Sequence, residues 1–134
     1  MILKQNNMIT EDYVSFETSK LLKEKGFNEK CRAFYTVWFD EEVEGPKEDE
    51  AENWNIEPRY FSAPTLQMAM KWLREVHNKS IEIRSQGLKV TGAGWIVEIY
   101  NLVNQDEEFH HPYTFPTYEE ACEAAIKYCL ENLI

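Results

Sequence analysis

One helix-start pattern occurs twice in the chain, and this repetition constrains the fold more than any other feature. The segments SAPTLQMAMKWL (62–73) and TFPTYEEACEAAIKYC (114–129) both place Pro-Thr before apolar residues at helical spacing. Placing Thr65 over Thr117 aligns the apolar positions without a gap. Threonine is a good helix N-cap, and a 3.6-residue apolar period indicates an amphipathic helix. Both segments are therefore predicted to be helices with one buried face.

The segments upstream of these helices also correspond to each other. CRAFYTVWFD (31–40) and WIVEIYNLV (95–103) are rich in aromatic and β-branched residues, which favour strands. In each half an acidic connection and a short aromatic strand follow, and then comes the helix. The halves 31–78 and 93–134 therefore predict two β-β-α units that pair edge to edge in one sheet. The alternative is convergence, because Pro-Thr before a helix is common chemistry.

The chain as a whole predicts a single α+β domain, residues 1–134, which is a usual domain length. A helix over residues 10–26 is expected at the start, since Thr10 suits an N-cap and Gly26 suits a C-terminal end. SIEIRS (80–85) alternates as a further strand. The expected fold is an antiparallel sheet of four to five strands with three helices and an internal β-β-α duplication.

Negative charge is concentrated in one segment of the chain. The formal net charge is −10, and residues 40–52 (DEEVEGPKEDEAE) contain eight acids and one lysine. Since this segment has a Gly-Pro pair and no apolar periodicity, it is predicted to be a solvated loop. An acidic loop beside aromatic and histidine side chains is also a candidate contact site for a basic protein partner. The candidate partner-binding residues are Glu41, Glu42, Glu44, Glu48, Asp49, Glu50, Trp54, His110 and His111.

The same charge disfavours direct nucleic-acid binding, which remains an alternative. Phosphate backbones repel an acidic segment, and the sequence has no compensating basic stripe. Protein partners are expected instead, including a second copy of the chain paired through a free sheet edge. No stretch approaches the ~18 apolar residues of a membrane span, and the first residues lack the apolar core of a secretory signal. We therefore expect a cytoplasmic location without membrane contact.

Residues 106–111 (DEEFHH) come nearest to a reactive cluster. Adjacent histidines on a strand point to opposite faces, whereas in a loop both could bind one ion with a carboxylate. An ordinary polar hairpin is the main interpretation, and a small metal-dependent or acid–base hydrolase is the alternative. The chain has no phosphate-binding or nucleophile motif, and its three cysteines are expected to be buried free thiols. No cofactor, metal or catalytic residue is assigned, and enzymatic activity is disfavoured.

Three phrases of the sequence resemble a known group of small proteins. They are ITEDYVSFETSKLLKEKGFNEKC (9–31), PTLQMAMKWLREVHN (64–78) and TYEEACEAAIKYCLENLI (117–134). Over most of its length the chain resembles uncharacterised proteins of gut Bacteroidales phages and other mobile elements. The resemblance implies a bacterial cytoplasm and a mobile-element context, but it implies no activity or catalytic residue. The leading expectation is a non-enzymatic accessory protein that acts through protein contacts.

Overall fold

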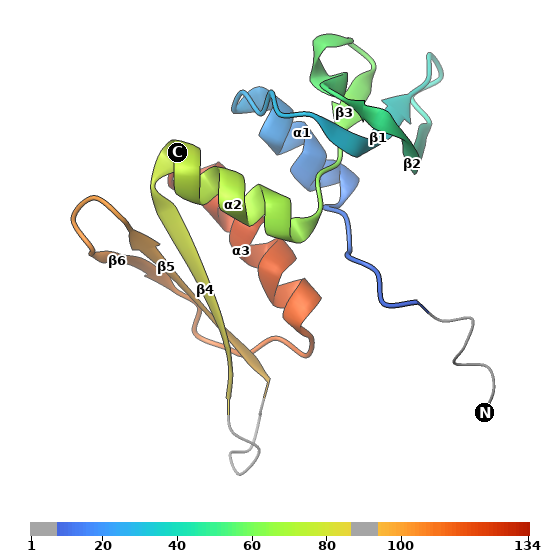
Figure 1. Cartoon of the computed structure of the whole chain (residues 1–134). Coiled ribbons are helices and arrows are strands. Elements are labelled where there is room, and N and C mark those ends of the chain that lie inside the picture. Colours follow the sequence, from blue (N-terminus) through green and yellow to red (C-terminus); the bar gives the residue numbers. More distant parts are fainter. Residues whose placement is uncertain (1–7, 87–93) are drawn as a thin grey trace, which may run out of the picture.

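The computed structural model describes residues 8–86 and 94–134, which form an α+β fold with helices between two antiparallel sheets (Figure 1). Helices α2 and α3 pack side by side against the sheet of β4, β5 and β6, while α1 contacts α3 and β3. No helix in these described ranges is long and apolar enough to span a membrane. The elements are α1 (Phe16–Glu24), β1 (Cys31–Val37), β2 (Val43–Glu52), the 3-10 helix η2 (Trp54–Ile56), β3 (Tyr60–Ser62), α2 (Leu66–His77), β4 (Lys79–Ser85), β5 (Trp95–Asn101), β6 (Glu107–His110) and α3 (Tyr118–Asn132).

The strands form two sheets of three, so the expectation of one sheet with four to five strands is wrong. The first sheet has the order β2-β1-β3 and the second has the order β4-β5-β6. The strands beside β1 are β2 and β3, both within residues 31–78, and those beside β5 are β4, which lies between the two halves, and β6. Neither central strand therefore has an edge left for the other half. The internal duplication stays a prediction, since the second sheet includes β4, which precedes residues 93–134.

The acidic segment is mostly a strand, so its assignment as a solvated loop is wrong. β2 pairs antiparallel with β1, and all ten of its residues are exposed. Main-chain hydrogen bonds to β1 hold this strand, and neither of its faces is buried. Its sequence therefore lacks the alternating apolar pattern by which strands are recognised. Gly45 has φ +131°, and a Cβ atom there would lie 2.8 Å from the carbonyl oxygen of Phe34. The close approach of the two strands therefore requires glycine.

The first helix begins at Phe16, later than the predicted residue 10. Ser15 is its N-cap, and the chain before Ser15 is held by the start of the second helix instead. The Val14 N–H donates to the Pro64 carbonyl at 3.0 Å. This main-chain pairing competes successfully with helix formation, because it satisfies backbone groups that would otherwise need helical partners.

The other helix ends lie where their capping residues predict them. Gly26 has φ +87°, and the Phe27 N–H donates to the Leu22 carbonyl at 2.9 Å. This geometry is the expected Schellman ending of α1. The hydroxyls of Thr65 and Thr117 each accept a hydrogen bond from the N–H three residues later, at 3.1 Å in both cases. The two copies of the Pro-Thr pattern therefore do start α2 and α3.

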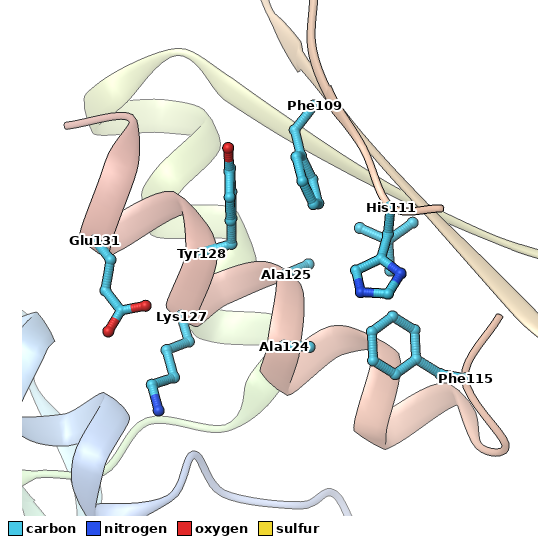
Figure 2. A pocket seen from close by; sticks show the side chains of 9 residues that line it. Phe109, His111, Phe115, Ala124, Ala125, Lys127, Tyr128 and Glu131 are labelled. Atoms are coloured by element: carbon cyan, nitrogen blue, oxygen red, sulfur yellow. The ribbon is translucent and has the colours of Figure 1, made fainter. Parts of the chain in front are cut away.

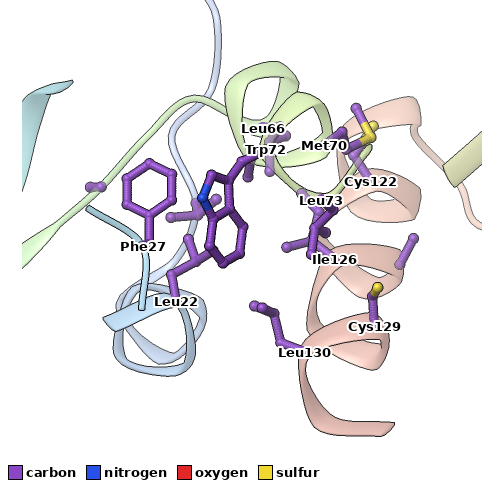
Figure 3. Close-up of a cluster of buried hydrophobic side chains, with 14 of the residues drawn as sticks. Leu22, Phe27, Leu66, Met70, Trp72, Leu73, Cys122, Ile126, Cys129 and Leu130 are labelled. Atoms are coloured by element: carbon purple, nitrogen blue, oxygen red, sulfur yellow. The ribbon is translucent and has the colours of Figure 1, made fainter. Parts of the chain in front are cut away.

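A cluster of buried apolar side chains joins the three helices (Figure 3). The rings of Phe27 and Trp72 meet edge to face with centroids 5.3 Å apart, and Leu22 lies beside them. Cys122 and Cys129 are fully buried on the face of α3 that packs into this cluster. Burial raises the pKa of the Cys122 thiol to about 11 and that of Cys129 to about 12. The prediction of buried free thiols is confirmed for both.

The short aromatic strand expected just before the last helix, HPYTF (111–115), lies earlier in the chain than predicted. β6 occupies Glu107–His110, which falls within the segment predicted to be a polar hairpin. A tight turn brings the chain back early, since the Asn101 N–H donates to the Asp106 carbonyl at 2.9 Å. Of the predicted return strand, Phe115 alone forms a bridge, with Trp95.

Candidate functional site

The second sheet divides the histidine pair between its two faces. His110 contacts Glu98, which lies between the buried residues Val97 and Ile99 on β5, so His110 is on the outer face of the sheet. His111 lies on the face toward α3 (Figure 2). This is the alternation expected of neighbouring residues in extended chain. The two histidines therefore cannot bind one ion, and each must be considered with its own neighbours.

The outer face carries a cluster of Glu98, Glu107 and His110. His110 Nδ1 lies 3.2 Å from Oε2 of Glu98 and 3.8 Å from Oε2 of Glu107. One donor atom of each residue lies within 4.8 Å of the others, a spacing that suits a metal ion. Arg84 also contacts the same Glu98 oxygen, at 3.2 Å. The Arg84 guanidinium, with His110 second to it, lowers the pKa of Glu98, so this carboxylate already has a cationic partner in Arg84.

The remaining acids of residues 106–111 lie elsewhere. Lys79 Nζ lies 2.6 Å from Oε1 of Glu108, with the two side chains 11% and 26% exposed. The hydrogen bond from Lys79 lowers the pKa of Glu108. Asp106 contributes its main chain to the turn before β6. The reactive cluster predicted from the sequence is therefore split, and only Glu107 and His110 of its members meet in one group.

On the inner side of the sheet, a cavity of about 330 Å³ lies between β6 and α3 (Figure 2). Aromatic rings form most of its wall: those of Phe109 and Tyr128 stack at 3.7 Å between centroids. The ring of His111 lies 4.6 Å from that of Phe115. Ala124 contributes only a methyl group to the floor, which leaves the space open. The result is an apolar cavity bordered by one histidine.

A second cleft adjoins this cavity at α3, and a third cleft adjoins the second beside β2. A cleft of about 470 Å³ shares Phe115 and Ala124 with the cavity. A third cleft, of about 770 Å³, shares Asp12 and Tyr13 with the second. We call these three adjoining clefts together the α3 groove; its lining is aromatic at β6 and acidic at β2. Its defining residues, in that order, are Phe109, Tyr128, Phe115, Glu119, Asp12 and Glu48.

The predicted acidic contact residues lie at the outer edge of the first sheet. Glu48 reaches the α3 groove, where it accepts a hydrogen bond from the Tyr13 hydroxyl at 2.5 Å. This contact raises the pKa of Tyr13. The predicted acids on β2 are Glu44, Glu48, Asp49 and Glu50, and those in the turn before it are Glu41 and Glu42.

Trp54, the aromatic member of the predicted set, is half-buried in η2. Its ring stacks on that of Phe34 at 4.1 Å between centroids, and its indole N–H donates to the Cys31 carbonyl at 2.8 Å. The ring therefore covers the outer face of β1. Contacts within the chain therefore explain why an aromatic residue follows the acidic strand, and no binding partner is needed to explain it.

Comparison with family models, curated proteins and solved structures found no match to this chain. The expected relation to phage-associated proteins therefore rests on three sequence phrases and stays a prediction. Three features of the described structure bear on function: the acidic edge strand β2, the clefts between it and an apolar cavity, and a Glu-His cluster on the outer face of the second sheet.

Proposed function

We propose that this protein is a non-enzymatic binding protein that engages a basic segment of a partner protein through β2. The observation that carries this proposal is the exposure of all ten residues of β2, a strand at the edge of its sheet. An edge strand offers main-chain donors and acceptors to another extended segment. Addition of a strand to such an edge is a common mode of peptide recognition.

The charge of β2 selects the kind of segment that can approach. Its sequence VEGPKEDEAE has five acids and one lysine, a net charge of −4. A second copy of β2 would bring the same charge, so pairing of two copies through this edge is opposed, and phosphate backbones are repelled as well. A lysine-rich or arginine-rich segment is attracted, and the attraction weakens as salt is added. An accessory role in the cytoplasm of a host that carries a phage-like element is part of the proposal, and only the sequence resemblance supports it.

The test is an amide-shift titration with two defined peptides of nine residues. One alternates lysine and threonine, and the other alternates glutamate and threonine. We expect the basic peptide to shift the amide signals of Val43–Glu52, less at high salt, and the acidic peptide to leave them unchanged. Absence of shifts in β2 with the basic peptide at millimolar concentration would refute the proposal.

A matched pair of charge variants separates a local site from general attraction. Reversal of Glu48, Asp49 and Glu50 to lysine should abolish the shifts. Reversal of three exposed acids away from β2 changes the net charge equally and should preserve them; the residues for this control are Glu24, Glu29 and Glu57. Equal loss in both variants would contradict a site on β2.

Metal-dependent hydrolysis is the second candidate function, and the observation that favours it is the Glu98, Glu107 and His110 cluster. One imidazole and two carboxylates form a donor set that suits Zn²⁺ with one position left for water. Calorimetric titration with Zn²⁺ tests this candidate. One-to-one binding that is lost in His110→Ala would support it, whereas an absence of binding to the wild-type chain would exclude it.

A further inference from the structure

We infer that the bound segment combines basic side chains with one apolar anchor side chain, and that the anchor enters the cavity between β6 and α3. This inference rests on the proposed function, because it assigns the chemistry of the same partner segment. It adds a second contact region, the α3 groove, and a spacing between the two kinds of side chain.

The cavity is suited to a single apolar group. Its volume of about 330 Å³ lies at the lower end of the range of roughly 300–1,000 Å³ found for ligand pockets. The stacked rings of Phe109 and Tyr128 and the ring of Phe115 supply apolar walls (Figure 2). A side chain that enters the cavity would be removed from water and would displace water from these apolar walls. An aromatic or large aliphatic residue is therefore favoured.

The next part of the groove is acidic. Glu119 and Glu120 line the second cleft at the start of α3, and Asp12 joins the second cleft to the third. Within the described residues, none of these three carboxylates forms an ion pair. Their charge is therefore available to a basic side chain that lies beside the cavity.

One basic residue, Lys127, lies at the rim of the cavity, but it does not cancel the negative charge of the groove. Lys127 Nζ lies 3.5 Å from Oε2 of Glu17, so its charge already has a partner. Glu131 lies at the same rim and adds a further carboxylate (Figure 2). The groove therefore presents an apolar end and an acidic end, and charge complementarity selects a basic segment with an apolar anchor.

The geometry of α3 sets the spacing within that segment. Tyr128 at the cavity and Glu120 in the acidic part are eight positions apart on one helix, which is roughly 12 Å at ~1.5 Å per residue. An extended segment covers this length with about four residues at ~3.3 Å each. The anchor and the first lysine or arginine should therefore stand about four positions apart.

The experiment compares fluorescent peptides of seven residues in binding to the whole chain, followed by anisotropy. The reference peptide has phenylalanine at position 1, serine and glycine at positions 2–4, and lysine or arginine at positions 5–7. Replacing phenylalanine by alanine should weaken binding about tenfold to a hundredfold, as expected for burial of one large apolar side chain. Equal binding of both peptides would overturn the inference.

Two protein variants locate the effect. Ala124→Leu fills the cavity and should weaken the phenylalanine peptide to the level of the alanine peptide, while the alanine peptide is unaffected. Joint replacement of Glu119 and Glu120 by glutamine should weaken both peptides, whereas the same change at Glu24 and Glu29 should weaken neither. Full binding of the phenylalanine peptide by a folded Ala124→Leu chain would also overturn the inference. Should that variant not fold, the comparison of peptides on the wild-type chain still decides.

The outcomes distinguish this inference from the proposed function. If charge reversal of β2 abolishes binding and the phenylalanine and alanine peptides bind equally, the proposed function stands and the anchor is refuted. If the phenylalanine peptide binds more tightly than the alanine peptide and the β2 charge-reversal variant binds both normally, the role of β2 is refuted instead. Binding that depends on phenylalanine but not on the basic residues would indicate a site for small apolar ligands and refute the basic segment.

Discussion

Glu123 of α3 is predicted to stabilise the fold by holding the start of α1. Its Oε1 accepts a hydrogen bond from the Ser15 N–H at 3.1 Å, and its Oε2 accepts one from the Ser15 hydroxyl at 2.5 Å. The Thr18 hydroxyl donates to the same Oε2. Thr18 is fully buried, so its hydroxyl has no access to water once the carboxylate is removed.

The size of the effect follows from these contacts. A hydrogen bond to a charged group contributes about 1.5–3 kcal/mol, and a carboxylate near a helix N-terminus contributes about 0.3–1 kcal/mol. The contacts share one carboxylate and are not additive, so Glu123→Ala should lower the free energy of unfolding by about 2–4 kcal/mol. Glu123→Gln keeps one acceptor and should cost about half as much.

Urea unfolding followed by tryptophan fluorescence measures this difference. Glu120→Ala is the matched control, because Glu120 is an exposed carboxylate in the first turn of the same helix, and its removal should cost no more than the roughly 0.3–1 kcal/mol of an acid near a helix N-terminus. A double-mutant cycle with Ser15→Ala should give a coupling energy of about 1 kcal/mol or more. If Glu123→Ala is no more destabilising than Glu120→Ala, the carboxylate does not hold α1 and the argument is refuted.

Three further predictions concern other parts of the fold. Gly45→Ala should destabilise the protein by about 1–3 kcal/mol in the same urea assay, because its Cβ would meet a β1 carbonyl. Lys79 lowers the folded-state pKa of Glu108. The pair therefore stabilises the fold above the ordinary carboxyl pKa of about 4.3, and this stability is lost as pH falls through the lowered pKa. In Glu108→Gln the free energy of unfolding should fall less steeply with decreasing pH, and we call this part of the pH profile the acid limb. Cys122 and Cys129, with pKa values of about 11 and about 12, should react with a thiol reagent at pH 8 only after unfolding.

Each of these predictions has an outcome that contradicts it. Wild-type stability of Gly45→Ala would show that the two strands can move apart without cost. An unchanged acid limb in Glu108→Gln would assign the acid sensitivity to other carboxylates. Fast labelling of both α3 cysteines in the folded chain would show that the cluster around them opens readily.

Local chemistry made the starts of α2 and α3 and the end of α1 predictable, whereas the start of α1 and the sheets depended on pairings that no single segment encodes. Thr65, Thr117 and Gly26 act through neighbours within a few residues, so their roles follow from the sequence. β2 is held by backbone pairing to β1 and has no apolar face, which removes the signal that strand prediction uses. The division into two sheets depends on which strands lie beside β1 and β5. These neighbours are set by the packing of the whole chain and cannot be read from any one segment.

The candidate site was predictable only in part, for the same reason. The acids of β2 were identified because charge is a property of composition, and the divergence of the two histidines follows from strand geometry. The cavity was not identified, because Phe109, Phe115 and Tyr128 have the spacing of ordinary core residues. Only the packing of β6 across α3 turns these rings toward one space.

The length of β2 distinguishes a binding edge from one that is merely protected against aggregation. Charges on an edge strand are a common protection, but proteins also protect edges by keeping them short. The other sheet follows the second course, since β6 has four residues. β2 is longer, with ten residues against seven in β1, and because Cys31 pairs with Glu52 and Val37 with Val43, its three extra residues form register shifts within that pairing. A ten-residue edge strand with every residue exposed is what our proposal of a contact with a basic segment requires.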